Sequence, residues 1–222
     1  MRNTITLALV ALAISCQGRP DSGLVLAPGD HKTGIDARYS EGEHAVTLHS
    51  TLANGAVVAD ITDERGHSIS KLAKTILDKP NLPVNALMAN ANTLGTALRL
   101  AQHGMRSLRD QLAGDEASSG VTAELSRQTG VVRSALTKTR LALLQAWGSE
   151  ARKHLTLTPD EHAKFFAILN RQATAMTGKT KSTTSYETEV AALLGPERYA
   201  QYKTRRAVWL APVGETAMEL VP

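Results

Sequence analysis

Apolar and polar residues alternate along the first part of the chain, as in strands with one buried face. The alternating runs are residues 35–39, 45–52 and 56–62. Asn54-Gly55 separates the last two runs and favours a type I′ hairpin turn, because both of its central residues take positive φ. A second turn at 63–66 leads into residues 67–70. We predict an antiparallel meander of three or four strands at about 35–70.

Beyond residue 80 the apolar positions recur every three or four residues, the spacing of one helix face. Pro83 suits the start of a helix and Gly114 its end. The seam of this helix is Val84, Leu87, Ala91, Leu94, Leu98, Ala101, Met105, Leu108 and Leu112. A second seam indicates a helix from about Val121 to His154. The short linker 115–120 predicts two antiparallel helices that bury their seams against each other.

The C-terminal third carries separate helix starts. Thr158 is an N-cap, Pro159 lies in the first turn, and Glu161 completes a capping box. Further helices are predicted over 184–194 and from Gly195 to about Trp209. The predicted fold class is therefore α+β, mainly α: a small antiparallel β-meander, a long antiparallel helical hairpin and a C-terminal group of shorter helices. The predicted segments are a signal peptide (1–15), a flexible tether (16–34), a β-rich module (35–79), the hairpin (80–154), the C-terminal helical region (155–210) and an irregular tail (211–222).

The composition is that of an ordinary globular protein, with 42% hydrophobic and 21% charged residues, which argues against wholesale disorder. The net charge of +4 raises the question of nucleic acid. However, basic residues are mixed with acidic ones, as in Arg106-Ser-Leu-Arg109-Asp110, and no aromatic–basic tract suited to stacking bases occurs. We predict a mildly basic solvated surface and no nucleic-acid partner.

The N-terminus has the layout of an export signal. Arg2 precedes an apolar run over residues 5–14, and the chain turns polar after Cys16. Such a run is too short for a permanent membrane span and is typical of a secretory signal peptide. Cys16 is the only cysteine of the chain, so no internal disulfide can form.

The segment Leu12-Ala13-Ile14-Ser15-Cys16 resembles the lipobox of bacterial lipoprotein precursors, although Ala13 and Ile14 depart from the usual residues. The resemblance implies diacylglycerol transfer to Cys16, cleavage before it, and acylation of the new N-terminus, so that fatty acids such as palmitate hold the chain to a membrane. Gln17 after the cysteine favours the outer over the inner membrane by enteric sorting rules. The alternative is a plain signal peptide that contains a cysteine and releases the protein.

Candidate chemistry is sparse in the rest of the sequence. His44 and His49 fall on opposite faces of one predicted strand, and no His-x-x-x-His pair or His-Glu-x-x-His motif occurs, so we predict no metal site and no cofactor. No Gly-x-Ser-x-Gly motif or phosphate-binding glycine loop suggests catalysis. Asp60, Asp63 and Glu64 are interpreted as residues that shape a turn.

Two helix starts resemble the paired Leu-Thr-x-x-Gln motifs of Spy/CpxP-type periplasmic stress proteins. They are Leu157-Thr-Pro-Asp-Glu161 and Leu194-Gly-Pro-Glu-Arg198, with Glu161 and Arg198 in place of the family's glutamines. The resemblance, over residues 157–206, implies a helical chaperone, in some relatives one that binds zinc. Convergence on the same capping chemistry is the alternative explanation.

These observations lead to two main hypotheses, and an enzyme with an unrecognised site is the third alternative. The first is a membrane-anchored envelope lipoprotein that acts as a non-catalytic binding or structural module, with another envelope protein or a second copy of itself as partner. The second is a periplasmic chaperone or metal-responsive stress protein of the Leu-Thr-x-x-Gln type.

Overall fold

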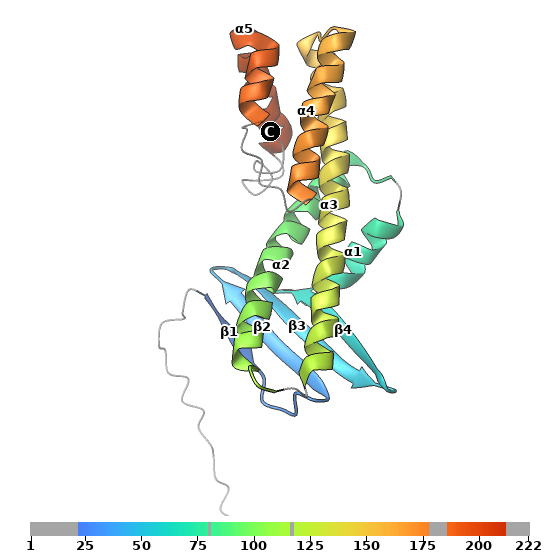
Figure 1. The fold of residues 1–222 in the computed structure, drawn as a ribbon, viewed down its shortest axis with the longest axis vertical. Helices are drawn as coiled ribbons and strands as arrows, with labels where there is room; N and C mark the ends of the chain where they lie inside the picture. Colours follow the sequence, from blue (N-terminus) through green and yellow to red (C-terminus); the bar gives the residue numbers. More distant parts are fainter. Residues whose placement is uncertain (1–21, 80, 116–117, 178–185, 212–222) are drawn as a thin grey trace, which may run out of the picture.

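The computed structural model describes residues 22–79, 81–115, 118–177 and 186–211. A four-stranded antiparallel meander precedes two long helices that pack together, and shorter helices follow, which confirms the predicted fold class. The sheet lies at one end of an elongated molecule, and the C-terminal helices α4 and α5 lie at the other (Figure 1).

The sheet has the strand order β1-β2-β3-β4, and each strand pairs with its neighbour in the sequence. Asn54 and Gly55 have φ of 52° and 76°, which confirms the predicted hairpin turn between the last two strands. The strand bounds are β1 Ser22–Leu26, β2 Gly34–Glu41, β3 His44–Ala53 and β4 Ala56–Asp63.

Two predictions about the ends of the β module are wrong. The predicted tether 16–34 contains β1, whose Leu24 and Leu26 pack on the core, so the fold begins by Ser22. Residues 67–70 do not form a strand, because the Ser68 side chain caps the N-terminus of helix α1 (Ile69–Asp78) by accepting a hydrogen bond from the Lys71 N–H. The predicted β-rich module 35–79 therefore ends in a helix.

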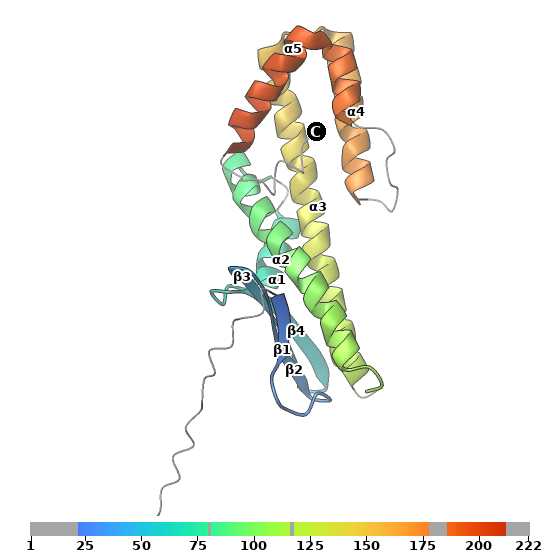
Figure 2. The same ribbon diagram turned by 90° about the vertical axis from the view of Figure 1, so that its left-hand side faces the viewer.

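Helices α2 (Val84–Gln111) and α3 (Ser119–Leu155) cover one face of the sheet and form the predicted antiparallel pair (Figure 2). Both seams are buried, apart from exposed Val84 and half-buried Leu112 at the ends of the first. The two seams pack against each other as predicted, and the sheet and α1 share the same core. At Gly104 an added Cβ would lie 3.0 Å from the Tyr39 Cβ, so α2 approaches the sheet closely.

A second core joins the N-terminal part of α2 and the C-terminal part of α3 to α4 (Pro159–Thr177) and α5 (Tyr186–Leu210). Its aromatic centre is Trp147, which packs on Tyr202 and Trp209. Burial raises the pKa of Tyr202 to about 12, so its phenol stays neutral. Gly195 is non-helical, with φ of 72°, and breaks α5 where the sequence predicted a boundary between two helices.

Lys138 fastens α1 to α3. Its ammonium donates to the carbonyl oxygens of Ile76, Leu77 and Lys79 at 2.9, 2.8 and 2.7 Å. These carbonyls lie at the C-terminus of α1, where they have no partner within the helix and where the helix dipole attracts a cation. A single side chain of α3 thus provides hydrogen bonds to the carbonyl groups at the end of a helix that is distant from it in sequence.

The predicted signal peptide 1–15, the predicted lipidation site Cys16 and the tail residues 212–222 lie outside the described residues, as do residues 178–185.

Candidate functional site

The edge of the sheet at which the described chain begins is tied to α2. Ser22, the first residue of β1, pairs with Glu41, the last residue of β2. The Glu41 carboxylate accepts a hydrogen bond from Arg99 at 2.5 Å, and its second oxygen lies 3.5 Å from His103 Nδ1. The hydrogen bond from Arg99 lowers the pKa of Glu41 below its ordinary value, with a smaller contribution from the charge of His103. This carboxylate is therefore an anion that holds two basic side chains of α2.

Next to this cluster, α2 and α3 enclose a groove of about 410 Å³ on the surface of the molecule. Three arginines line it, Arg106 and Arg109 from α2 and Arg133 from α3, and all three are exposed. The remaining lining residues are Gln102, His103 and Asp110. With one carboxylate against three guanidinium groups, the lining has a net charge of +2 when His103 is neutral.

The groove offers donors for an anion. Arg109 donates to the Ser126 hydroxyl of α3 at 2.8 Å, which fixes one guanidinium across the two helices. Guanidinium groups present planar, forked N–H donors that match phosphate and carboxylate oxygens in pairs. Gln102 adds an amide beside them. The arrangement suits binding of an oxyanion rather than bond-making chemistry.

The sequence did not reveal this groove. Arg99, His103, Arg106 and Arg109 recur every three or four residues along α2, beside its apolar seam. That spacing was the available signal, but in the sequence the charges look interspersed, because acidic neighbours such as Asp110 stand beside them. Arg133 joins the set only through the register of α3 against α2.

A smaller cavity of about 250 Å³ lies between the ends of β3 and β4 and helix α2. His44, Asp63, Arg65 and Asn92 contribute to its polar lining. Asp63 is committed to the turn that follows β4, since it accepts from the backbone N–H groups of Arg65 and His67 at 2.9 and 2.8 Å. The interpretation of Asp63 as a turn residue is confirmed.

The two helix starts that resemble the stress proteins meet in space. Glu161 accepts a hydrogen bond from Arg198 at 2.6 Å, and its other oxygen accepts from the backbone N–H of Thr158 at 3.0 Å, as in the predicted capping box. The bond from Arg198 is the main reason that the pKa of Glu161 falls to about 2. The two residues that replace the family's glutamines therefore form an ion pair between α4 and α5.

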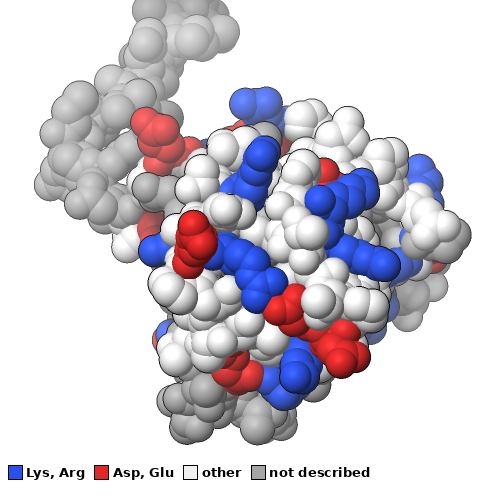
Figure 3. All heavy atoms as spheres, turned by 90° about the horizontal axis from the view of Figure 1, so that it is seen from above, with Lys and Arg blue, Asp and Glu red and all other residues white. Residues whose placement is uncertain are grey.

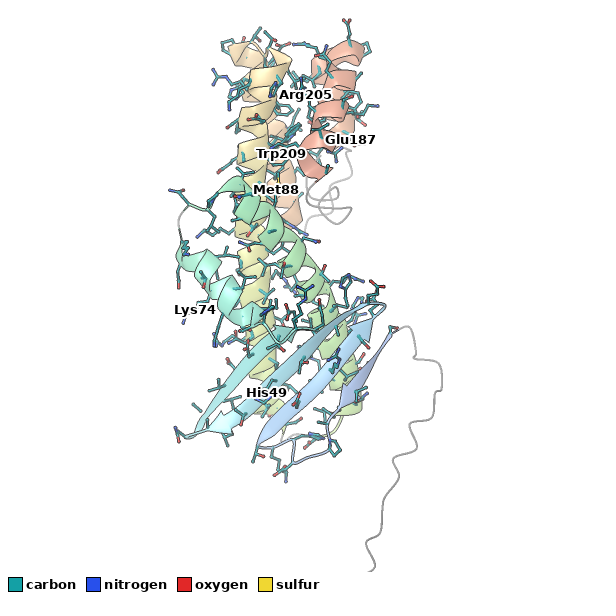
Figure 4. The ribbon with its side chains drawn as sticks, turned by 180° about the vertical axis from the view of Figure 1, so that it is seen from behind. His49, Lys74, Met88, Glu187, Arg205 and Trp209 are labelled. Atoms are coloured by element: carbon teal, nitrogen blue, oxygen red, sulfur yellow. The ribbon has the colours of Figure 1, made fainter. Side chains whose placement is uncertain are left out.

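His44 and His49 lie on opposite faces of β3, as the strand pattern predicted. His49 is exposed on the face of the sheet that the helices leave uncovered (Figure 4), whereas His44 lines the cavity on the other side. Among the described residues, no three His, Cys, Asp or Glu side chains gather in a way that could hold a metal ion. Within the same residues, none of the helices is both long enough and apolar enough to cross a bilayer.

No protein-family model, curated protein or solved structure matches this chain. Among the surfaces of the described residues, the basic groove between α2 and α3 has the side chains best suited to binding a ligand.

Proposed function

We propose that this chain is a lipid-anchored protein of the bacterial envelope that acts as a non-catalytic binding module. The observation that carries the proposal is the apolar leader that ends at the only cysteine of the chain, six positions before the first described strand. Acyl chains on Cys16 would hold the sheet end near the membrane, since each buried CH₂ contributes about 0.8 kcal/mol.

The described body suits such a role. Helix α3 has 37 residues and a length of about 55 Å at 1.5 Å per residue. It connects the sheet, where the anchored segment joins the fold, to the distal helices α4 and α5 (Figure 1). Helix α3 thus gives the molecule the form of a rod, with one end near the anchor and the other end free to contact a partner protein.

Mass spectrometry of the mature N-terminus tests the proposal. The wild-type protein is expected to begin at Cys16 and to carry the mass of a diacylglycerol and an amide-linked acyl chain. The Cys16→Ser variant should lack that mass. An unmodified N-terminus elsewhere in the wild-type protein would contradict lipid attachment.

A second candidate function is the chaperone hypothesis. The Glu161–Arg198 pair supports it, because the two helix starts that resemble the stress-protein motifs face each other. Suppression of aggregation of a thermally unfolded client, measured by light scattering, is the expected activity. Client aggregation that is unchanged at equimolar protein would contradict it.

A further inference from the structure

The basic groove lies close to the point at which the anchored segment joins the fold. Ser22 pairs with Glu41, Glu41 contacts His103, and His103 lines the groove. Ser22 lies six positions after Cys16, so the Cα of Cys16 can lie no more than about 21 Å from that of Ser22 at the sheet edge. A membrane that held Cys16 would therefore pass within reach of this groove.

The side chains of the groove are complementary to the phosphate groups of a phospholipid surface. Arg106, Arg109 and Arg133 present guanidinium groups from two helices, and Asp110 is the one carboxylate of the lining. Phosphate diesters of anionic lipids accept forked hydrogen bonds from such groups. Basic residues next to a membrane anchor are attracted by the negative surface potential of anionic lipids.

The opposite end of the molecule carries charges of both signs. Seen from above, basic and acidic side chains are interspersed over the end formed by α3, α4 and α5 (Figure 3). Ion pairs there include Lys153–Glu150 at 3.2 Å and Arg198–Glu161 at 2.6 Å. In the groove lining, three arginines stand against the single carboxylate of Asp110, so the groove is a local concentration of positive charge.

We propose that the α2–α3 groove binds the phosphate groups of anionic phospholipids and so provides a second membrane contact beside the lipid anchor. The position of the membrane near the groove rests on the proposed function, because the anchor at Cys16 would bring the membrane to this end. Because several acyl chains on Cys16 would already give stable attachment, the contribution of the groove is to hold the folded body against the membrane surface. The groove would also orient the rod relative to the membrane.

Sedimentation with vesicles tests whether the groove binds a membrane when the lipid anchor on Cys16 is absent. A chain that begins at Gln17 keeps every described residue, and circular dichroism of each variant verifies its fold. Vesicles of phosphatidylcholine containing 30% phosphatidylglycerol should bind this chain at low salt, whereas pure phosphatidylcholine should not. Binding should weaken as salt screens the charges. The Arg106→Gln, Arg109→Gln, Arg133→Gln triple variant should lower the partition coefficient about 100-fold, as expected for three basic residues.

The matched control removes three charges from the distal end, through Lys153→Gln, Lys164→Gln and Arg205→Gln, and should bind as the parent chain does. Equal losses in both triple variants would overturn the groove as the site, as would equal binding to neutral vesicles. Binding of soluble heparin without binding to anionic vesicles would overturn a membrane as the occupant. Because every protein in this test lacks Cys16, the outcome is independent of whether that residue is acylated.

Discussion

Lys138 holds the C-terminus of α1 through three charge-assisted hydrogen bonds of 2.7–2.9 Å. Lys138→Met keeps the aliphatic stem and removes all three donors, which leaves helix-end carbonyls without a partner. We expect a loss of about 2 kcal/mol in the free energy of unfolding, measured in urea. Lys153→Met removes only an exposed ion pair with Glu150 and should change stability by less than about 0.5 kcal/mol. Equal effects of the two variants would contradict the role of Lys138.

Glu161 makes stability depend on pH. Its pKa is about 2 in the folded protein, mainly because Arg198 donates to it, against an ordinary value of 4.5. A lowered pKa means that Glu161 stabilises the fold fully above pH 4.5 and loses that contribution as pH falls toward 2. The stability difference between wild type and Glu161→Gln should therefore be largest at neutral pH and should shrink across this window.

Thermal unfolding of both proteins between pH 7 and pH 2.5 measures this difference. Glu197→Gln changes an exposed glutamate of α5 and provides the control. A difference between wild type and Glu161→Gln that stays constant with pH would show that the ion pair with Arg198 does not stabilise the fold.

At the scale of elements, the contact between α3 and α4 depends on Gly148. A Cβ at this position would lie 2.7 Å from the Phe166 Cζ and 2.9 Å from its Cε2. Gly148→Ala should therefore destabilise the protein by about 1 kcal/mol or more, because overpacking exceeds the gain in helix propensity. Gly130→Ala, in the same helix with nothing within 4 Å, should stabilise it by about 0.5–1 kcal/mol. Urea titration of both variants checks the opposite signs.

Most elements were predictable because their signals are local. Asn54-Gly55 determined the β3–β4 turn, and the three- and four-residue spacing of α2 and α3 predicted their buried faces. Strand β1 was missed because its short run of Leu24 to Leu26 lies between glycine and proline residues that suggest a tether. Helix α1 was missed because it is short and its Ser68 cap directly follows a turn that also suits a hairpin.

The candidate site was harder to predict from the sequence, because its residues are distant from one another along the chain. Arg109 and Arg133 lie 24 positions apart and meet only through the packing of α2 on α3. The same holds for the contact of Glu41 with Arg99, which depends on how the sheet sits under α2. Such groups can be listed from sequence, but their proximity follows from tertiary packing.

At the scale of the whole molecule, the fold separates two ends with different surfaces. The sheet end carries the start of the described chain and the basic groove, and the distal end carries α4, α5 and a mixture of charges (Figures 1 and 3). Only five residues lie between Cys16 and the first described strand, whereas the prediction placed 18 residues between Cys16 and the β-rich module. Attachment at Cys16 would therefore restrict how far the sheet moves from the membrane.

Metabolic labelling with radioactive palmitate tests lipid attachment most directly. Cells that produce the wild-type chain should incorporate the label into a protein of the expected size. The Cys16→Ser variant, which lacks the acceptor thiol, should remain unlabelled at equal abundance. An unlabelled wild-type protein, or a label that persists in Cys16→Ser, would contradict a lipid anchor at this cysteine.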